Sequence, residues 1–219
     1  MLEGKTLERL SESFSSMLHA INMKSLKHPV FYNAPIGIRF EIGGNENVYL
    51  DNSCTVNPAY ISAAFARAKT IYENLPHSPD ILRIDIYLNG QKSMHEIILE
   101  VCAEAKLPQP DEQVLVPFKW HEGDEPIPQL QLYWDLKKRQ LIPDVLLKKI
   151  IEADIGGYFE FASNVYFSDT QDFILFHLYD DRGVDLIGAR KELIQPMFER
   201  FKSWISDYDR ERINAIFSR

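Results

Sequence analysis

The chain has little cysteine and no long uninterrupted apolar segment. Its 219 residues include two cysteines, Cys54 and Cys102, and neither lies in a CxxC pattern or beside a histidine at metal-ligand spacing. Both lie in apolar surroundings, so we expect two buried, reduced thiols in a cytoplasmic protein, with no bound metal ion or other cofactor. No apolar run reaches the length that crosses a bilayer, so a membrane partner is not expected.

Basic charge is also scarce, since 24 Lys and Arg residues stand against 32 Asp and Glu residues and leave a net charge of −8. Such a chain is repelled by phosphate backbones, so generic binding to nucleic acid is not expected. The same charge suits solubility or a basic protein partner. Residues 1–20 are expected to form a charged amphipathic helix rather than a secretory signal.

Familiar catalytic motifs are missing as well. The sequence has no GxSxG, and His95-Glu96 is not followed by the second histidine of a zinc protease. The glycine pairs in GGNEN and ADIGGYFE lack the lysine and hydroxyl residue of a phosphate-binding loop. These absences favour a protein without catalytic activity.

The remaining pattern predicts an α+β fold: a mainly antiparallel sheet with a C-terminal three-strand meander, covered by helices, in one domain over residues 1–219. Alternating apolar residues predict strands near Ile38, Leu82, Leu130, Val165, Ile174 and Leu186. Helical spacing predicts helices over 6–21, 57–76, 93–106, 143–157, 191–205 and 207–217.

Residues 107–129 hold five of the 12 prolines and several acids, and are expected to form a linker or a long surface loop. Phe118 and Trp120 lie in this segment. If they are exposed, they form a protein-binding patch with an acidic rim; the alternative is that they fold back onto the strand at Leu130. The acids of the rim are Glu122, Asp124 and Glu125.

The most crowded stretch is LYDDRGVDLIG, residues 178–188, where two carboxylates, a guanidinium and a glycine separate two apolar runs. A hairpin turn favours aspartate at its start and glycine at a positive φ, so Asp180, Asp181 and Gly183 need no other role. An enzyme is the alternative, because alternation places His177 and Tyr179 on one strand face that Asp181 would continue. The candidate residues for such a site are His177, Tyr179, Asp180, Asp181 and Arg182.

A third interpretation of this stretch is structural. The final helix contains DYDRER, which is also dense in opposite charges. Asp180 or Asp181 would pair with Arg210 or Arg212 and dock that helix on the hairpin. In the same arrangement Arg182 would pair with Asp207 or Asp209.

Several of these segments resemble one uncharacterised bacterial family, the domain of unknown function 3885. The similarity is strongest at VYF, FHLYDDRGVDLIG and WISDYDRERI, and extends to FYNAPIGIRFEIGG and RAKTIYE. The resemblance implies one integrated bacterial domain and no particular reaction. We therefore expect a protein-interaction module, of which an immunity protein that binds a basic partner is one type. The alternative is a hydrolase or metal-dependent enzyme centred on YDDRG.

Overall fold

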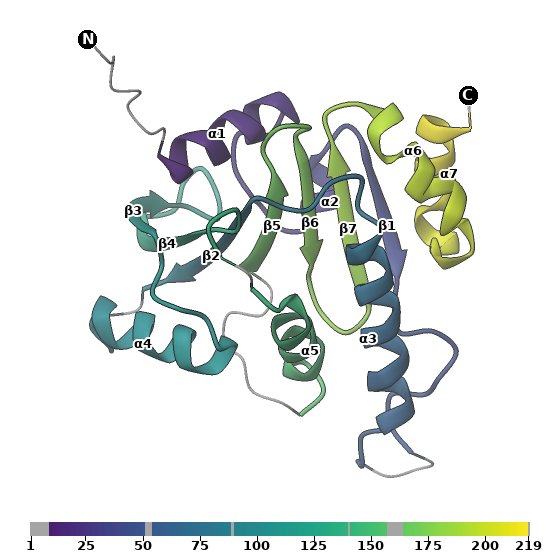
Figure 1. Cartoon of the computed structure of the whole chain (residues 1–219), viewed down its shortest axis with the longest axis horizontal. Helices are drawn as coiled ribbons and strands as arrows, with labels where there is room; N and C mark the ends of the chain where they lie inside the picture. The colour runs from purple at the N-terminus through teal and green to yellow at the C-terminus, as the bar shows by residue number, and fades with distance from the viewer. Residues whose placement is uncertain (1–8, 51–53, 89, 140, 157–163, 219) are drawn as a thin grey trace.

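A computed structural model describes residues 9–50, 54–88, 90–139, 141–156 and 164–218 (Figure 1). Its centre is a seven-stranded sheet in the order β1-β7-β6-β5-β2-β4-β3, and every neighbouring pair is antiparallel. This confirms the predicted antiparallel α+β fold and its meander, β5-β6-β7. The strands are β1 (Gly37–Glu41), β2 (Ile81–Tyr87), β3 (Glu112–Phe118), β4 (Ile127–Asp135), β5 (Val165–Asp169), β6 (Ile174–Leu178) and β7 (Gly183–Gly188).

Helices cover both faces of the sheet (Figure 1). The helices are α1 (Leu10–Ala20), α2 (Val30–Asn33), α3 (Pro58–Glu73), α4 (Met94–Ala105), α5 (Pro143–Ala153), α6 (Lys191–Arg200) and α7 (Asp207–Phe217). Helices α3 to α7 pack in one apolar cluster, whereas α1 contributes to a second cluster on the opposite face. Among the described helices, none combines the length and apolar character needed to cross a bilayer.

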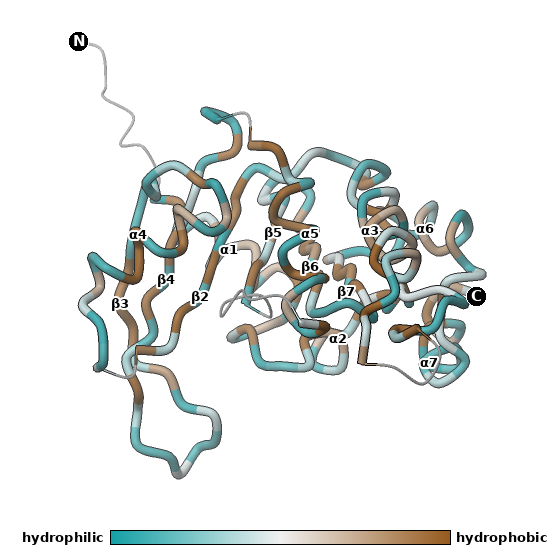
Figure 2. Tube along the Cα trace, turned by 90° about the horizontal axis from the view of Figure 1, so that it is seen from below, coloured by the Kyte–Doolittle hydropathy of each residue, from teal (hydrophilic) through white to brown (hydrophobic). Residues whose placement is uncertain are grey.

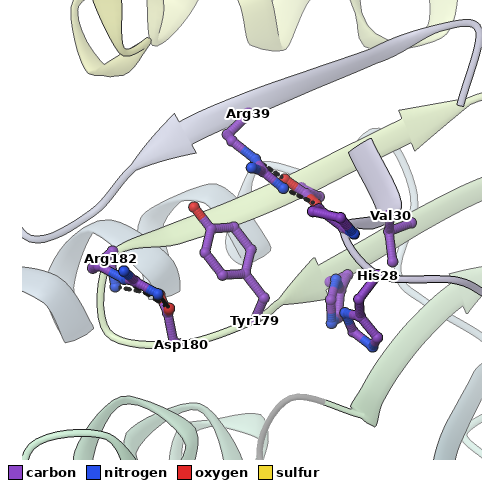
Figure 3. Close-up of a pocket in the computed structure, with 9 residues that line it drawn as sticks. His28, Val30, Arg39, Tyr179, Asp180 and Arg182 are labelled. Carbon is purple, nitrogen blue, oxygen red and sulfur yellow. Dashed lines mark hydrogen bonds and ion pairs between the residues drawn. The ribbon is translucent and has the colours of Figure 1, made fainter. Parts of the chain in front are cut away.

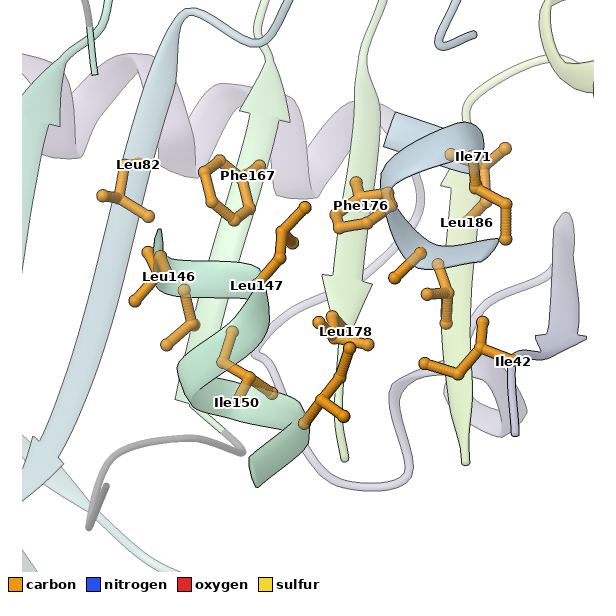
Figure 4. Close-up of a cluster of buried hydrophobic side chains, with 14 of the residues drawn as sticks. Ile42, Ile71, Leu82, Leu146, Leu147, Ile150, Phe167, Phe176, Leu178 and Leu186 are labelled. Carbon is orange, nitrogen blue, oxygen red and sulfur yellow. The ribbon is translucent and has the colours of Figure 1, made fainter. Parts of the chain in front are cut away.

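The larger core lies between the sheet and helices α3 and α5. Figure 4 shows Leu147 and Ile150 of α5 lying over the strands that carry Phe167 and Phe176, with Ile71 of α3 near Phe176. All these side chains are almost fully buried. Burying an aliphatic or aromatic side chain of this size contributes about 1.5–3 kcal/mol, so this layer dominates the stability of the fold.

The opposite face carries polar side chains on successive strands. Arg39 of β1 lies opposite Asp185 of β7, and Asp185 lies opposite His177 of β6. Farther along the sheet, Arg83 of β2 lies opposite Tyr166 of β5. Buried polar groups need partners, so this row requires ion pairs and hydrogen bonds beneath α1 and α2.

The proline-rich segment contains more structure than its composition predicts. Residues 112–118 form the edge strand β3, and residues from Ile127 onward pair with it in β4. Pro117 lies directly opposite Pro128, so both missing N–H donors fall on one rung of the ladder. The expected loop or linker is therefore wrong for much of 107–129: loops remain at 107–111 and at 119–126, the second being the β3–β4 loop.

Candidate functional site

A pocket of about 340 Å³ lies on the polar face of the sheet, beside the turn between β6 and β7. Four of the five residues predicted for an enzymatic site line it, and Asp181 does not. The loop before α2 forms another wall. The lining residues of this β6–β7 pocket are His28, Pro29, Val30, Arg39, His177, Tyr179, Asp180, Arg182 and Asp185.

A buried ion pair forms one wall of the pocket. Arg39 Nε and Nη2 donate to the two carboxylate oxygens of Asp185 at 2.7 and 2.8 Å, and the Asp185 side chain has no exposed area. The backbone N–H of Phe31 also donates to Asp185, at 3.1 Å. The Arg39 guanidinium lies 4.7 Å from the centre of the Tyr179 ring. These contacts satisfy a carboxylate that would otherwise be very costly to bury.

A second ion pair closes the turn. Asp180 accepts hydrogen bonds from the Arg182 backbone N–H and from Arg182 Nε, each at 2.8 Å, and from Arg182 Nη2. The bond to the backbone two residues ahead is the turn role predicted for Asp180. Figure 3 shows the Tyr179 ring between this ion pair and the Arg39–Asp185 pair. Burial raises the pKa of the Tyr179 hydroxyl, which therefore stays a neutral phenol in the physiological range.

Gly183 completes the turn for a different reason from the one predicted. It is not among the described glycines with positive φ. A Cβ atom at this position would instead meet the Tyr179 hydroxyl oxygen at 2.0 Å and the Phe40 carbonyl oxygen at 2.9 Å. Close packing, and not a left-handed backbone, therefore requires glycine here.

Two histidines lie at the inner end of the pocket. The His28 ring centre is 5.1 Å from that of His177, and the His177 ring stacks on Tyr166 at 4.8 Å. His28 Nε2 and the Tyr166 hydroxyl oxygen are 2.9 Å apart. Burial lowers the pKa of His28, against the opposing effects of Asn164 and the nearby carboxylates. A neutral imidazole at this position can accept a proton or bind a polar ligand.

The predicted alignment of His177, Tyr179 and Asp181 is wrong, because the turn directs Asp181 away from the pocket lining and towards helix α3. There its carboxylate accepts a 2.6 Å hydrogen bond from the Tyr60 hydroxyl of α3. Burial raises the pKa of Asp181, the Tyr60 hydrogen bond opposes this, and the charge of Asp180 adds to it. Asp180 lines the pocket in its place.

Three carboxylates near the turn are close enough to share a cation. Ligand atoms of Asp154, Asp180 and Asp181 all lie within 4.8 Å of one another. Two of them already have strong partners, since Arg182 pairs with Asp180 and Tyr60 donates to Asp181. A cation here would have to compete with the Arg182 guanidinium.

The predicted docking of the last helix on the hairpin is wrong. Arg210 Nε binds Asp207 at 2.8 Å within α7, and Arg182 binds Asp180 within the turn. Arg210 and Arg182 thus each pair within their own segment and not with each other's. Polar contacts join α7 to the α2 segment: Tyr32 donates to Asp209 at 2.7 Å, and Arg212 donates to the carbonyl oxygens of Tyr32 and Ala34 at 3.3 and 3.2 Å.

The predicted partner-binding residues lie at the far end of the sheet. Phe118 is only 8% exposed, whereas Trp120 is 47% exposed. Both rings pack on Tyr87 of β2, and all three pairs of ring centres are 4.8 Å apart. Of the acids beside them, Glu122 and Glu125 are exposed and Asp124 is partly exposed.

Sequence patterns did not identify Arg39, Asp185 and His28 as pocket residues. Alternation with Ile38 and Phe40 places Arg39 on the polar side of its strand but indicates no pocket, and the signal at Asp185 is a lone charge inside the apolar run VDLIG. Such a charge on a central strand indicates a buried partner. Nothing local to His28 indicates that it meets β6.

Comparison with known proteins agrees with the resemblance seen in the sequence. The model of the family described as "Domain of unknown function (DUF3885)" matches residues 14–209, so the chain belongs to this family. It is also similar to the uncharacterized protein YnaE of Bacillus subtilis (strain 168), with 27% identity over 201 residues, 82% of this chain and 91% of that protein. No solved structure matches the chain.

Proposed function

We propose that this member of the DUF3885 family binds a basic protein through the β3–β4 loop and the adjoining edge strand. The observation that carries the proposal is the half-exposed indole of Trp120, which Tyr87 and Phe118 hold in place. A rigid tryptophan loses little conformational entropy on binding and is a frequent anchor of protein interfaces.

The setting of Trp120 supports this interpretation. Figure 2 shows the β3–β4 loop projecting beyond the ends of β2, β3 and β4. Strand β3 lies at the edge of the sheet, and its Leu115 is 53% exposed. An edge strand offers backbone donors and acceptors to a partner, while Pro117 limits uncontrolled pairing. The acids Glu122 and Glu125 and the net charge of −8 favour a basic partner by accelerating encounter.

The test is affinity capture from an extract of the producing cells with three immobilised proteins: the wild type, Trp120→Ala and Tyr208→Ala. Tyr208 is a matched control because it is an exposed aromatic residue on α7, away from the loop. We expect a basic protein that the wild type and Tyr208→Ala retain, that Trp120→Ala loses, and that high salt releases. Retention by all three proteins, or no specific partner at low salt, would contradict the proposal.

We extend this proposal to an immunity-type role in the bacterial cytoplasm, in which the acidic loop covers the functional surface of a basic toxin. Cys102 is buried as predicted, whereas Cys54 is exposed, so the prediction of two buried thiols is wrong for Cys54. Both cysteines are free, and a free exposed thiol supports a reducing compartment. Co-expression tests this extension: the wild type should restore growth of cells that express the captured partner, and Trp120→Ala should not. A captured partner that does not impair growth when expressed alone would contradict it.

We also propose that the chain is one domain. The sheet places β4, from the middle of the sequence, next to β2 and places β2 next to β5, so the C-terminal strands share a sheet with the earlier ones. Limited trypsin digestion provides the test. Cleavage in the β3–β4 loop should leave fragments that remain associated, whereas two independently folded fragments would require a two-domain description.

A second candidate function rests on the β6–β7 pocket. Its volume of about 340 Å³ lies in the range of small-molecule sites, and it combines the imidazoles of His28 and His177 with the guanidinium groups of Arg39 and Arg182. We propose, as the alternative, that it binds a small anionic ester and supports hydrolysis, with His28 as the candidate base. The Asp154, Asp180 and Asp181 cluster would serve a metal-dependent version of the same site.

Chromogenic carboxylate and phosphate esters, with and without Mn²⁺, test the alternative. The informative variant is His28→Gln, and the matched control is His121→Gln in the β3–β4 loop. Activity that His28→Gln loses and His121→Gln keeps would support a hydrolase. Absence of turnover with every ester, or equal turnover in both variants, would exclude it for these substrates.

A further inference from the structure

We propose that a divalent transition-metal ion binds between His77, Asp169 and Asp172, at the end of β6 remote from the YDDRG turn. Asp169 ends β5, Asp172 lies in the turn that leads to β6, and His77 belongs to the loop between α3 and β2. Ligand atoms of the three side chains all lie within 4.8 Å of one another. This proposal does not depend on the function of the β3–β4 loop or of the β6–β7 pocket.

The three side chains already converge on one point. His77 Nδ1 lies 2.6 Å from Asp172 Oδ2 and 3.6 Å from Asp169 Oδ2. Ligand bonds of about 2.0–2.2 Å, as zinc makes to imidazole and carboxylate, place neighbouring ligand atoms about 3–4 Å apart. Only small side-chain adjustments would therefore be needed to admit an ion.

The independent observation that points to a bound cation is the bonding of one carboxylate oxygen of Asp169. The Asp169 side chain is only 6% exposed, and it lines a pocket of about 310 Å³ together with His77 and Asp172. Its Oδ1 accepts the backbone N–H of Gln171 at 2.9 Å, whereas Oδ2 has no hydrogen-bond partner among the described residues. A buried carboxylate oxygen without a donor is costly, and a cation would supply the missing interaction.

A neighbouring carboxylate in the same pocket provides the contrast. Asp80 is as deeply buried as Asp169, yet both of its oxygens are bonded. Oδ1 accepts the Thr170 N–H at 3.0 Å, and Oδ2 accepts the Thr170 hydroxyl at 2.6 Å and pairs with Lys137 at 2.9 Å. The fold thus satisfies Asp80 completely and leaves Asp169 Oδ2 directed at the histidine and the second aspartate.

The donor set points to the class of ion. One imidazole nitrogen and two carboxylate oxygens exclude a soft thiolate-type site and balance the charge of a divalent ion. Imidazole favours a transition metal over Ca²⁺ or Mg²⁺, which prefer oxygen ligands. Zn²⁺ binds such ligands more tightly than Mn²⁺ or Fe²⁺ does, so Zn²⁺ is the most sensitive probe. A site with three protein ligands leaves a coordination position open towards the pocket.

The full-length chain, freed of metal by a chelator, should be titrated with Zn²⁺ by calorimetry and with Co²⁺ by visible absorption. The two test variants are His77→Gln and Asp172→Asn, whose side chains are partly exposed and tolerate replacement. The matched control is His95→Gln, an exposed histidine on α4. Loss of an outer-shell partner typically weakens metal binding about 10–100-fold, and loss of a direct ligand should cost at least as much.

We expect one bound ion in the wild type and in His95→Gln, and binding weaker by about tenfold or more in both test variants. Zn²⁺ should also raise the unfolding temperature of the wild type and of His95→Gln more than that of the test variants. Absence of saturable binding would overturn the proposal. Binding in His77→Gln and Asp172→Asn that is as tight as in the wild type would also overturn it, because the ion would then lie elsewhere, for example at Asp154, Asp180 and Asp181.

Discussion

Tyr60 of helix α3 donates a 2.6 Å hydrogen bond to the carboxylate of Asp181 in the turn between β6 and β7. The adjacent carboxylate, Asp180, lines the β6–β7 pocket and binds Arg182 instead. Two consecutive aspartates therefore serve two different layers of the fold. One fastens the turn to a helix, and the other shapes the pocket wall.

The charge of Asp181 should cost stability at neutral pH. Its pKa is raised, chiefly by burial, so the folded protein binds the proton more readily than the unfolded chain does. Stability therefore increases as the pH falls through the folded pKa towards the unfolded value of about 3.9. Asp181→Asn keeps an oxygen for Tyr60 and removes the charge, so it should unfold at a higher temperature at neutral pH.

Circular dichroism melts of Asp181→Asn and the wild type at a series of pH values test this expectation. The advantage of the variant should shrink as the pH approaches the unfolded value of about 3.9. Tyr60→Phe is the control. It removes the hydrogen bond that stabilises the Asp181 carboxylate against the effect of burial, so it should destabilise the protein at neutral pH. Lower stability of Asp181→Asn at neutral pH would show that the charge is favourable.

Protonation of His28 should oppose folding. Because burial lowers its pKa, the unfolded chain takes up a proton near the ordinary value of about 6.5 before the folded protein does. Stability is thus lost as the pH falls from that value to the lower folded pKa. His28→Gln retains a polar group near Tyr166, and it should reduce the loss of stability over this pH range.

Urea unfolding at pH values above and below about 6.5 measures the effect of His28. The wild type and the exposed-histidine control His95→Gln should both lose stability on acidification, and His28→Gln should lose less. Equal slopes for the wild type and His28→Gln would assign the pH dependence to other groups.

Gly183→Ala should be strongly destabilising because the new Cβ would meet the Tyr179 hydroxyl oxygen at 2.0 Å. The Phe40 carbonyl oxygen, a backbone atom, lies 2.9 Å from the same position, so a shift of the Tyr179 side chain alone would not relieve the overlap. Overpacking of this kind costs about 1–3 kcal/mol. Chemical denaturation should show such a loss.

Gly123→Ala provides the matched control for Gly183→Ala. No atom lies within 4 Å of a Cβ built at Gly123, in the β3–β4 loop. An exposed change of this kind should stay within about 0.5 kcal/mol of the wild type. Similar losses in both variants would mean that the contact at Tyr179 does not set the requirement for glycine.

Double-mutant cycles should separate the true contacts of α7 from those predicted by charge alone. Tyr32→Phe and Asp209→Ala remove the two ends of one 2.7 Å hydrogen bond and should couple by about 0.5 kcal/mol or more. Asp181→Ala and Arg210→Ala remove groups with different partners and should add to within about 0.5 kcal/mol. Thermal or urea unfolding of each set measures the coupling, and coupling between Asp181 and Arg210 would place α7 against the hairpin.

Local patterns in the sequence were sufficient for most helices and strands. Alternation identified the meander β5-β6-β7, and Asn57 followed by Pro58 marked the start of α3, where the Asn57 side chain accepts the Ala59 N–H at 3.0 Å. These features depend on residues only a few positions apart in the sequence, so a short stretch of chain is enough to predict them. The family resemblance rests on the same segments.

The proline content of residues 107–129 predicted a loop where strand β3 forms. Composition alone does not reveal that Pro117 and Pro128 lie opposite each other in the sheet. That pairing depends on the register of two strands. Strand register is decided by the whole sheet, in which β3 adds to the free edge of β4.

Local sequence patterns were therefore enough to predict the α+β class and the meander, and to single out the residues around the turn as candidates for a functional site. The partners and surroundings of those side chains depend on the folded arrangement of the whole chain. It gave Asp180 and Asp181 different partners, brought His28 and Arg39 to the pocket, and placed His77 beside Asp169. A charged side chain can be satisfied by many partners, and only the path of the chain through space selects among them.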